Sequence, residues 1–528
     1  MIVHTRARPR AGASMEEWRV GEAGVRRTCA PRRGRARPRV TFIHGRRLGG
    51  AVSAGLLGGR QAEAASHLLS TMPHFDRIFR VDEMEARTRA LASEHRGVLE
   101  VETIGASREG RPVEAVRTGG GAHTLLLLGF PHPDEGVGSL LLDHLIERAC
   151  ARPELLAAFD LRLVAVKCWD IDGAKLNEGW FPGVESFSDQ ARDHFRPPPA
   201  MQMEWTFPVE YKTHRWDLVP PETEAVRKLI LAEKPDFMLG LHNAAVHDPY
   251  FYLSEPAPGA YGALEAAVVA EGLTLSDRSP NVPFEVPLAP GVFRMYGLRD
   301  YFDHYAAHEP HRLAHIRRGA CSDEFLARAV PGSFSFNAEV PRMLDPRVRD
   351  RAVTATPLAA VLERRRRAHV REMEALVRRI GPLMREPRDG ESLVVQSVRM
   401  HIEEYRAREE GGGTLTDPRH ELPPAPALPK TAVHGEPMAT VADTFEAEVV
   451  GPYEDLLVLG EGWRAAAELR AAGVPGAAEA RRALGARIDD VSDDLQARSS
   501  FAPVTLRAAA SVQLRALLAL LAWRFGPG

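Results

Sequence analysis

The chain has 528 residues, 44% of them apolar and 26% charged, which is ordinary for a globular protein of more than one structural unit. Its net charge of -3 excludes the basic balance of nucleic-acid-binding or membrane-surface proteins, so we expect neither partner. The four cysteines show no CxxC spacing, which excludes a disulfide framework and favours reduced thiols.

Residues 1–71 form an arginine-rich leader. The first 60 residues hold 14 arginines against three glutamates, and such a segment buries too little apolar surface to order itself. We therefore expect residues 1–71 to be disordered and the protein to be cytoplasmic. Export is the alternative, because Arg46-Arg47, the weakly apolar run after them and AEA at 62–64 are typical of a twin-arginine signal.

From about residue 76 the sequence alternates helix and strand patterns. A helix is predicted over 84–97, and the continuous apolar run HTLLLLGF at 123–130 predicts a buried strand. Further elements follow in chain order: strand 99–105 before that run, then helix 136–150, strand 160–170, helix 221–234, strand 236–242 and strand 333–340. Strands that alternate with helices favour an α/β fold with a largely parallel sheet.

After about residue 345 the pattern becomes helical. The helices are predicted at 357–385, 391–409 and over most of 438–528, with a Gly/Pro-rich linker near 410–437. We therefore divide the chain into the leader at 1–71, an α/β domain at 72–345 and a helical region at 346–528. Arg507 and Arg515 interrupt the last apolar helix, so we expect it to pack in the protein or to form a homo-oligomer interface, and not to cross a membrane.

Four side chains able to do chemistry lie at the ends of predicted strands. His132 and Glu135 follow the strand that ends near 130, His242 ends the strand 236–242, and Glu339 ends another. Ligands bind at the carboxyl ends of strands in open α/β sheets, so the four converge if the strands are neighbours. Two histidines and a glutamate suit one Zn2+ ion with a position left for water. Glu339 would then take the proton of that water and pass it to the leaving amine.

This combination resembles the zinc metallocarboxypeptidases of the carboxypeptidase A type. HPDE at 132–135 is similar to the family's His-x-x-Glu pair, LGLHN at 239–243 to the third-ligand segment, and SFSFNAEV at 333–340 to the general-base strand. Further similar segments are IGASREGRPV (104–113), in which Arg111 matches a substrate-binding arginine, WDIDG (169–173) and PPETEAVRKLI (220–230). The resemblance covers roughly residues 76–345 and implies a mixed sheet of about eight strands flanked by helices.

The segment QMEWTFP at 202–208 departs from the family's pattern. The family has an Asn-Arg pair there that clamps the substrate's terminal carboxylate, whereas this chain places Glu204 and Trp205 in that part of the substrate site. A glutamate would repel the carboxylate that an arginine fork binds. Arg196 is the best match for the family's oxyanion-stabilising arginine, and Arg192 is the second.

Other side chains near these motifs have weaker signals. Asp134 is expected to cap the helix that starts near 136, with a contact to a metal ligand as the alternative. Tyr301 and Tyr305 are weak matches for the family's mobile tyrosine. Three aromatic residues are expected to pack in the core, with an apolar substrate pocket as the alternative: Trp180, Phe181 and Trp205.

The residues and the resemblance together predict a zinc-dependent metallocarboxypeptidase that hydrolyses a C-terminal peptide bond, with Glu339 as general base and then acid. The first alternative is a related zinc amidohydrolase or deacylase whose substrate has no free α-carboxylate, which Glu204 and Trp205 favour. The second alternative is a catalytically inactive pseudo-peptidase that binds a partner. The expected substrate is a peptide or another amide.

Overall fold

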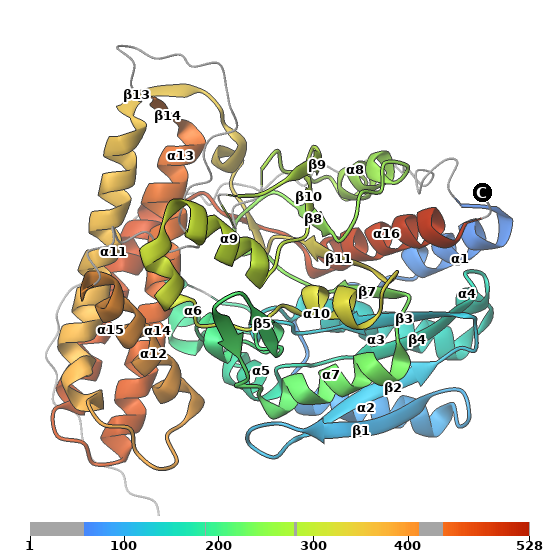
Figure 1. Cartoon of the computed structure of the whole chain (residues 1–528), viewed down its shortest axis with the longest axis horizontal. Helices are drawn as coiled ribbons and strands as arrows, with labels where there is room; N and C mark the ends of the chain where they lie inside the picture. The colour runs from blue at the N-terminus through green and yellow to red at the C-terminus, as the bar shows by residue number, and fades with distance from the viewer. Residues whose placement is uncertain (1–56, 185, 279–281, 283, 411–436, 527–528) are drawn as a thin grey trace, which may run out of the picture. The chain divides into compact units, whose positions relative to one another are not determined.

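A computed structural model describes residues 57–184, 186–278, 282, 284–410 and 437–526, which lie in one compact unit. Within them, nine strands form one mixed sheet (Figure 1). The strands of this sheet are β1 (Glu100–Ala106), β2 (Pro112–Thr118), β3 (His123–Leu128), β4 (Leu161–Val166), β7 (Phe237–Gly240), β8 (Tyr250–Leu253), β9 (Pro287–Ala289), β10 (Val292–Arg294) and β11 (Phe334–Glu339). The α/β prediction is confirmed, with nine strands in place of about eight.

The order of the strands is β1-β2-β4-β3-β7-β11-β8-β10-β9. The central strands β4, β3, β7 and β11 are parallel, whereas β2 and β8 run antiparallel to their neighbours β4 and β11. The last four residues of β3 are all buried, which explains its continuous apolar sequence. Because the centre is parallel, the carboxyl ends of β3, β7 and β11 lie at the same edge of the sheet.

Helices cover both faces of the sheet (Figure 1). They are α1 (Gly59–Ser70), α2 (Val81–Glu94), α3 (Val137–Ala151), α4 (Glu154–Ala157), α5 (Ile171–Asn177), α6 (Phe187–Asp193), α7 (Pro221–Glu233), α8 (Tyr261–Val269), α9 (Leu298–His308), α10 (Ser322–Ala329), α11 (Leu358–Ile380), α12 (Leu393–Glu410), α13 (Val441–Phe445), α14 (Gly451–Ala471), α15 (Ala477–Arg498) and α16 (Leu506–Phe525). On one face Leu125 and Leu127 share a core with α1, α3, α8 and α16. On the other face Leu126 and Leu128 share a core with α7 and α10.

Short ladders and turns complete the described chain. The two-stranded ladders pair β5 (Val209–Tyr211) with β6 (His214–Trp216), β12 (Met343–Leu344) with β15 (Ala502–Pro503), and β13 (Val353–Pro357) with β14 (Met438–Thr440). The 3-10 turns are η1 (Pro199–Met201), η2 (Met203–Trp205), η3 (Pro310–His315), η4 (Pro346–Arg349) and η5 (Gly381–Met384), and η6 (Glu446–Val450) is a π-helical turn.

The last helix, α16, packs into the core of the sheet. Its buried residues Leu517 and Leu521 lie in the same cluster as the apolar residues of β3 and β7. Among the described helices, α16 alone is long and apolar enough to cross a membrane by length and composition, and 72% of its apolar window is buried inside the protein. The helical region that begins after residue 345 therefore lies in the same compact unit as the sheet and contributes α16 as cover for one of its faces.

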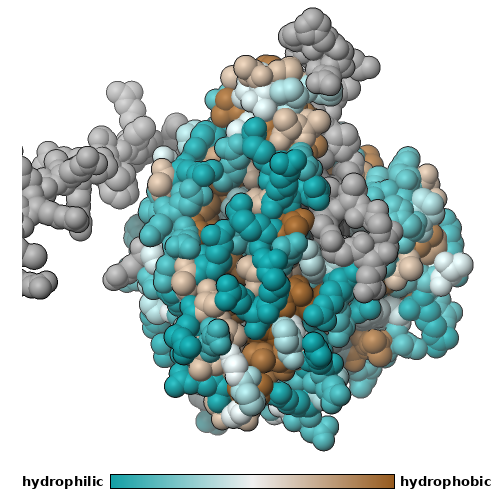
Figure 2. Space-filling model, turned by 90° about the vertical axis from the view of Figure 1, so that its left-hand side faces the viewer, coloured by the Kyte–Doolittle hydropathy of each residue, from teal (hydrophilic) through white to brown (hydrophobic). Residues whose placement is uncertain are grey.

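The other C-terminal helices form a second core beside the sheet. The predicted helices at 357–385 and 391–409 are confirmed as α11 and α12, which pack with α14, α15 and α6 of the α/β part. The predicted linker lies almost wholly at 411–436, outside the described residues. Figure 2 shows the side of the molecule that carries these helices as mainly hydrophilic, with apolar residues in small separate groups.

The last part of the predicted leader, from Gly59 to Ser70, is helical and not disordered. Helix α1 begins at Gly59, and its buried residues Ala65 and Leu68 pack in the same core as α16. The apolar residues after Arg60 have a partner surface that local composition does not reveal, so this helix is ordered by tertiary packing. Residues 1–56, including Arg46 and Arg47, lie outside the described residues.

Candidate functional site

Three adjacent strands bring four predicted site residues to one edge of the sheet. His132 and Glu135 lie in the loop after β3, His242 lies two residues after β7, and Glu339 is the last residue of β11. Because β3, β7 and β11 are parallel neighbours, these side chains meet at the carboxyl ends of the strands. Gly240 leaves room for the ring of His242, since a Cβ atom at position 240 would lie 2.9 Å from its Nε2.

His132, Glu135 and His242 form a buried group of donor atoms that fits a metal ion. Their ligand atoms all lie within 4.8 Å of one another, and each residue is at most 6% exposed. His132 Nδ1 is 2.9 Å from Glu135 Oε1, and His242 Nδ1 is 2.8 Å from Glu135 Oε2. Two imidazole nitrogens and a carboxylate that converge in this way are a donor set that suits a divalent metal ion.

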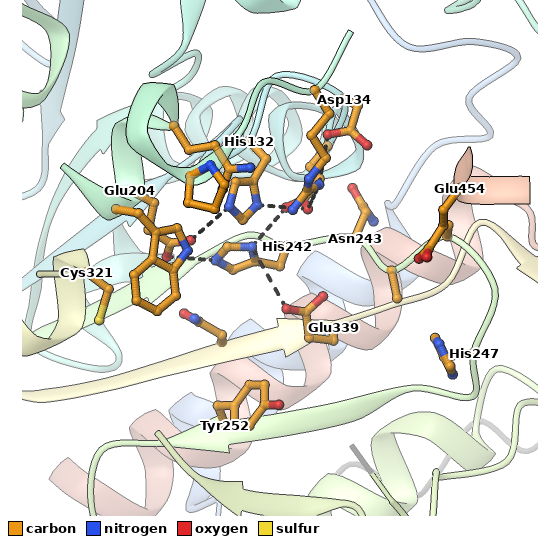
Figure 3. Close-up of a pocket in the computed structure, with 18 of the residues that line it drawn as sticks. His132, Asp134, Glu204, His242, Asn243, His247, Tyr252, Cys321, Glu339 and Glu454 are labelled. Atoms are coloured by element: carbon orange, nitrogen blue, oxygen red, sulfur yellow. Dashed lines mark hydrogen bonds and ion pairs between the residues drawn. The ribbon is translucent and has the colours of Figure 1, made fainter. Parts of the chain in front are cut away.

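Glu204 contacts both histidines on their other side. The sequence predicts a substrate contact for this residue, but the 3-10 turn η2 directs its carboxylate to the imidazoles (Figure 3). Its Oε1 is 3.1 Å from His242 Nε2, and its Oε2 is 3.2 Å from His132 Nε2, the second at ion-pair distance without hydrogen-bond alignment. Burial would raise the pKa of Glu204, but the imidazoles, His242 foremost, hold it below its usual value. The histidines thus lie between two carboxylates.

Glu339 and Glu204 lie on opposite sides of His242 (Figure 3). Glu339 Oε1 is 4.0 Å from His242 Nδ1, the nitrogen that faces the donor group. Burial raises the pKa of Glu339 to about 7, while the His242 imidazole opposes the rise and nearby carboxylates add to it. A carboxyl group in this position can exchange a proton with water near neutral pH.

Arg196 reaches the same centre from the loop after α6. Its Nη1 donates to Glu135 Oε1 at 2.7 Å and to Asp134 Oδ1 at 2.9 Å. The other oxygen of Asp134 lies 3.3 Å from His194 Nε2, so this carboxylate holds two residues of the Arg196 segment. The capping prediction for Asp134 is wrong, because α3 starts after Gly136 without a side-chain cap and the Asp134 carboxylate is engaged by the arginine.

The other two arginines of the sequence prediction lie elsewhere. Arg111 donates through Nη1 to Asp172 and to Glu109, both at 2.5 Å, and it does not line the cavity described below. Arg192 on α6 donates to Asp489 at 2.7 Å. The substrate-binding role of Arg111 therefore has no support from its position, and Arg196 is the arginine that the structure brings to the donor group.

The donor group opens into a cavity of about 230 Å³. Its aromatic lining residues are Trp205, Tyr250, Tyr252, Tyr296 and Tyr301. Tyr305 does not line it, and Trp180 and Phe181 pack in a buried cluster against α2 and α5, as the core prediction has it. The sequence allows either a core position or a pocket position for Trp180, Phe181 and Trp205, and of these three only Trp205 lines the cavity.

A second part of the cavity wall comes from the helical region. The lining residues there recur at helical spacing along η6 and α14: Glu446, Val450, Glu454, Leu457, Val458 and Glu461. Figure 3 shows Glu454 and His247 on the side of His242 away from Glu204. Single π-helical turns such as η6 often occur at functional sites. Sequence reasoning finds none of these residues, because an amphipathic helix carries no motif that points to a particular cavity.

The helical region also fixes the backbone of two site segments. Glu461 accepts a hydrogen bond from the Arg196 amide at 2.8 Å, and Gln513 on α16 donates to the His242 carbonyl at 2.9 Å. Arg464 donates to the His194 carbonyl at 3.2 Å. The partners of the first two bonds are 265 and 271 residues apart in sequence, so no local pattern could have indicated them.

No protein-family model and no curated protein matches the sequence. Solved structures similar to this chain include a metallo-carboxypeptidase from Burkholderia cenocepacia, at 15% identity and a TM-score of 0.31, over 50% of this chain and 60% of the other. A carboxypeptidase A from Helicoverpa armigera is similar at 15% identity and a TM-score of 0.32, over 53% of this chain and 71% of the other.

The murein-tripeptide amidase MpaA from Escherichia coli O157 is similar at 17% identity and a TM-score of 0.24, over 47% of this chain and 86% of that chain. The match to the Burkholderia cenocepacia metallo-carboxypeptidase spans only 60% of the length of that protein.

Proposed function

We propose that this chain is a zinc-dependent hydrolase of peptide or related amide bonds. The observation that carries the proposal is the buried group of His132, Glu135 and His242, with the carboxyl group of Glu339 beside the Nδ1 atom that faces the group. A zinc ion held by these three ligands would supply Lewis acidity, which polarises a carbonyl group and acidifies water.

The protein's own groups supply the remaining chemistry. Glu339 accepts the proton of the attacking water and returns it to the leaving nitrogen, so that one carboxyl group acts as base and then as acid. Arg196 places a guanidinium beside the donor group, where it stabilises negative charge on the attacked oxygen. Glu204 accepts from the Nε2 side of His242, which keeps Nδ1 available as a metal ligand.

The leaving group separates two candidate functions within this class. A carboxypeptidase must bind a free terminal carboxylate, and the charge of Glu204 does not oppose this because both its oxygens face imidazoles. A deacylase or amidohydrolase whose substrate has no carboxylate is favoured by Trp205, an uncharged ring on the cavity wall. We propose the carboxypeptidase as the first candidate, because Arg318, which lines the cavity over the rings of Trp205 and Tyr301, offers a guanidinium to a terminal carboxylate.

The test is hydrolysis of a benzoylated dipeptide by the purified full chain, with and without a chelator. We expect the chelator to abolish hydrolysis and zinc to restore it. We expect Glu339→Gln to lower kcat by about 100-fold or more while the bound zinc remains. The control is Glu255→Gln, an exposed carboxylate that pairs with Arg524. Full activity of Glu339→Gln would contradict the proposed role of this residue, and absence of hydrolysis in the zinc-loaded wild type would favour the inactive pseudo-peptidase.

A further inference from the structure

Helix α9 carries two histidines that lie one helical turn apart and do not line the catalytic cavity. Four of the 20 histidines of the chain fall within residues 304–315, which run from α9 into the turn η3. Histidine-rich tracts of this kind are typical of metal-binding segments. Two of the four, His304 and His308, are four residues apart on α9, which places both on one face of the helix.

The two imidazole rings of this pair have nearly the same mutual geometry as the imidazoles of the candidate metal centre. The ring centres of His304 and His308 lie 4.8 Å apart, with 61° between the ring planes. The corresponding values for His132 and His242 are 5.1 Å and 57°. Two imidazoles whose nitrogens bind one ion at about 2.0–2.1 Å have ring centres about 5 Å apart. The backbone of α9 therefore already provides the separation that a shared ion requires.

Packing restrains one ring of the pair and leaves the other accessible. The inner face of α9 is buried through residues such as Tyr301 and Tyr305, which fixes the direction of its outer face. His304 is half-buried, and the centre of its ring lies 5.0 Å from that of Phe284. His308 is exposed. An ion can thus approach from the solvent and meet one ligand that is already restrained, which reduces the side-chain freedom lost on binding.

The charges around the pair are compatible with a bound cation. Burial lowers the pKa of His304 below its ordinary value, and His308 adds to this effect, so the His304 ring is neutral near pH 7, as a metal ligand must be. His308 is the last residue of α9, where the helix dipole favours positive charge. The other charged groups that act on His304 are Glu309 and Arg312, which neutralise each other in an ion pair at 2.8 Å.

We propose that His304 and His308 form a second metal site, which binds a divalent transition-metal ion of the Zn2+ or Cu2+ type with water as the remaining ligands. Imidazole nitrogens suit these ions, whereas Ca2+ and Mg2+ prefer oxygen ligands. Two ligands that face solvent hold an ion less firmly than three buried ones, so this ion exchanges and is lost on dialysis. The inference goes beyond the proposed hydrolase function and does not depend on it.

The proposed site lies next to the wall of the catalytic cavity. Tyr301 lines the cavity from the same helix, and its ring centre lies 5.1 Å from that of Phe284, the ring that also contacts His304. An ion bound by the pair thus restrains the last turn of α9 beside a residue of the cavity wall.

The test is equilibrium dialysis of the zinc-loaded full chain against a series of free Zn2+ concentrations. We expect the wild type to take up one exchangeable Zn2+ ion, which leaves again in zinc-free buffer. His304→Gln and His308→Gln should each weaken this uptake by about tenfold or more, because the loss of a ligand costs at least as much as the loss of a ligand's hydrogen-bond partner. His308 is exposed, so its variant keeps the fold, which circular dichroism checks.

The matched control is His311→Gln, which removes an exposed histidine of η3 from the same tract and should keep the exchangeable ion. An equal loss in this control would overturn the assignment to the α9 pair, because the ion would then bind to exposed imidazoles in general. A wild type that takes up no exchangeable ion would also overturn it, and so would uptake that is unchanged in both α9 variants.

Cu2+ as a probe reports the ligands themselves. One equivalent of Cu2+ added to the zinc-loaded wild type should give an electron paramagnetic resonance spectrum with coupling to two nitrogen atoms, while the zinc content stays unchanged. In His308→Gln the coupling to the second nitrogen should disappear. A spectrum without nitrogen coupling, or one that is the same in His308→Gln and in the wild type, would overturn the second site whether or not the protein hydrolyses amides.

Discussion

The α/β part and the helical region contribute to the candidate site in different ways. The α/β part delivers the proposed metal ligands and Glu339, each at or within a few residues of a strand end. The helical region delivers no metal ligand, but it holds the backbone of ligand-bearing and arginine-bearing segments through Gln513 and Glu461. The groups proposed to do the chemistry thus lie at one edge of the sheet, whereas the backbone of two of their segments is held by helices far away in sequence.

The largest effect on stability is expected from a buried ion pair of the helical region. Arg365 on α11 donates to Asp455 on α14 at 2.6 Å, and both side chains are buried. We expect Arg365→Met to lower the free energy of unfolding by about 3–5 kcal/mol, because a buried carboxylate loses its guanidinium. Urea denaturation followed by circular dichroism measures this.

The control for that variant is Arg367→Met on the same helix. Arg367 is exposed and pairs with Glu363, so its loss should change stability by about 0–1 kcal/mol. Equal effects of the two variants would contradict the stabilising role of the buried pair. If Arg365→Met still folds but no longer binds zinc, the claim that the metal site depends mainly on the α/β part is contradicted.

The next effect concerns the alignment of the metal ligands within the α/β part. Glu204→Gln replaces the acceptor of the His242 Nε2 proton and removes the charge beside His132. We expect the affinity for zinc to fall by about 10- to 100-fold, as when other carboxylate partners of metal-bound histidines are changed. Competition with a chromophoric chelator measures the affinity, and Glu255→Gln is the control. If the zinc affinity of Glu204→Gln is unchanged and its KM is higher, Glu204 binds the substrate and does not position the metal ligands.

A smaller effect is expected from the helical region's hold on the arginine segment. Glu461→Leu removes the acceptor of the Arg196 amide, so the guanidinium should move relative to the reacting centre. We expect kcat to fall by about tenfold while the zinc affinity changes little, since misplacement of a catalytic group is costly even when ligands are intact. Steady-state kinetics and the chelator assay measure both quantities, with the exposed Glu479→Leu as control. An equal loss of zinc affinity would show that α14 supports the whole centre.

The smallest effect near neutral pH concerns Asp455. Burial would raise the pKa of this carboxyl, but Arg365 and His369 hold it well below its usual value. A folded-state pKa below the unfolded value of about 3.9 contributes stability above that pH, and this contribution is lost as the pH falls further. Urea-denaturation midpoints should therefore fall as the pH is lowered below about 4, and this fall should be less steep in Asp455→Asn. Parallel curves would contradict the role of the ion pair.

Local patterns predict the parts of the site that lie next to strand ends. The apolar run of β3 and the His-x-x-Glu pair after it place His132 and Glu135 at a strand end, and the same reasoning places His242 and Glu339. Their roles as ligands and base follow from the combination of these positions and from the resemblance to the metallocarboxypeptidases. The role of Glu204 is harder to predict, because spacing gives its place in the chain but not the direction in which η2 turns its carboxylate. The ladder order of nine strands likewise depends on pairing that the sequence does not state.

Non-local contacts explain the remaining differences. Asp134 has the sequence position of a helix cap, but an arginine 62 residues later engages its carboxylate. The sequence of helix α1 is typical of an unfolded leader, but its apolar side packs against α16. Arg318 has no distinctive motif, and only the fold reveals that it stacks on Trp205 and Tyr301. These features arise from tertiary packing, which single-segment patterns do not encode.

The proposed metal centre is tested most directly by the zinc stoichiometry of the full chain and of two histidine variants. We expect one zinc ion per chain by elemental analysis after dialysis, and its loss in His242→Ala and in His132→Ala. The exposed His308→Ala should retain the ion, since His308 lies on α9 outside the cavity. Retention of one tightly bound ion by both ligand variants, or no ion in the wild type after zinc loading, would contradict the claim that His132, Glu135 and His242 form the metal centre.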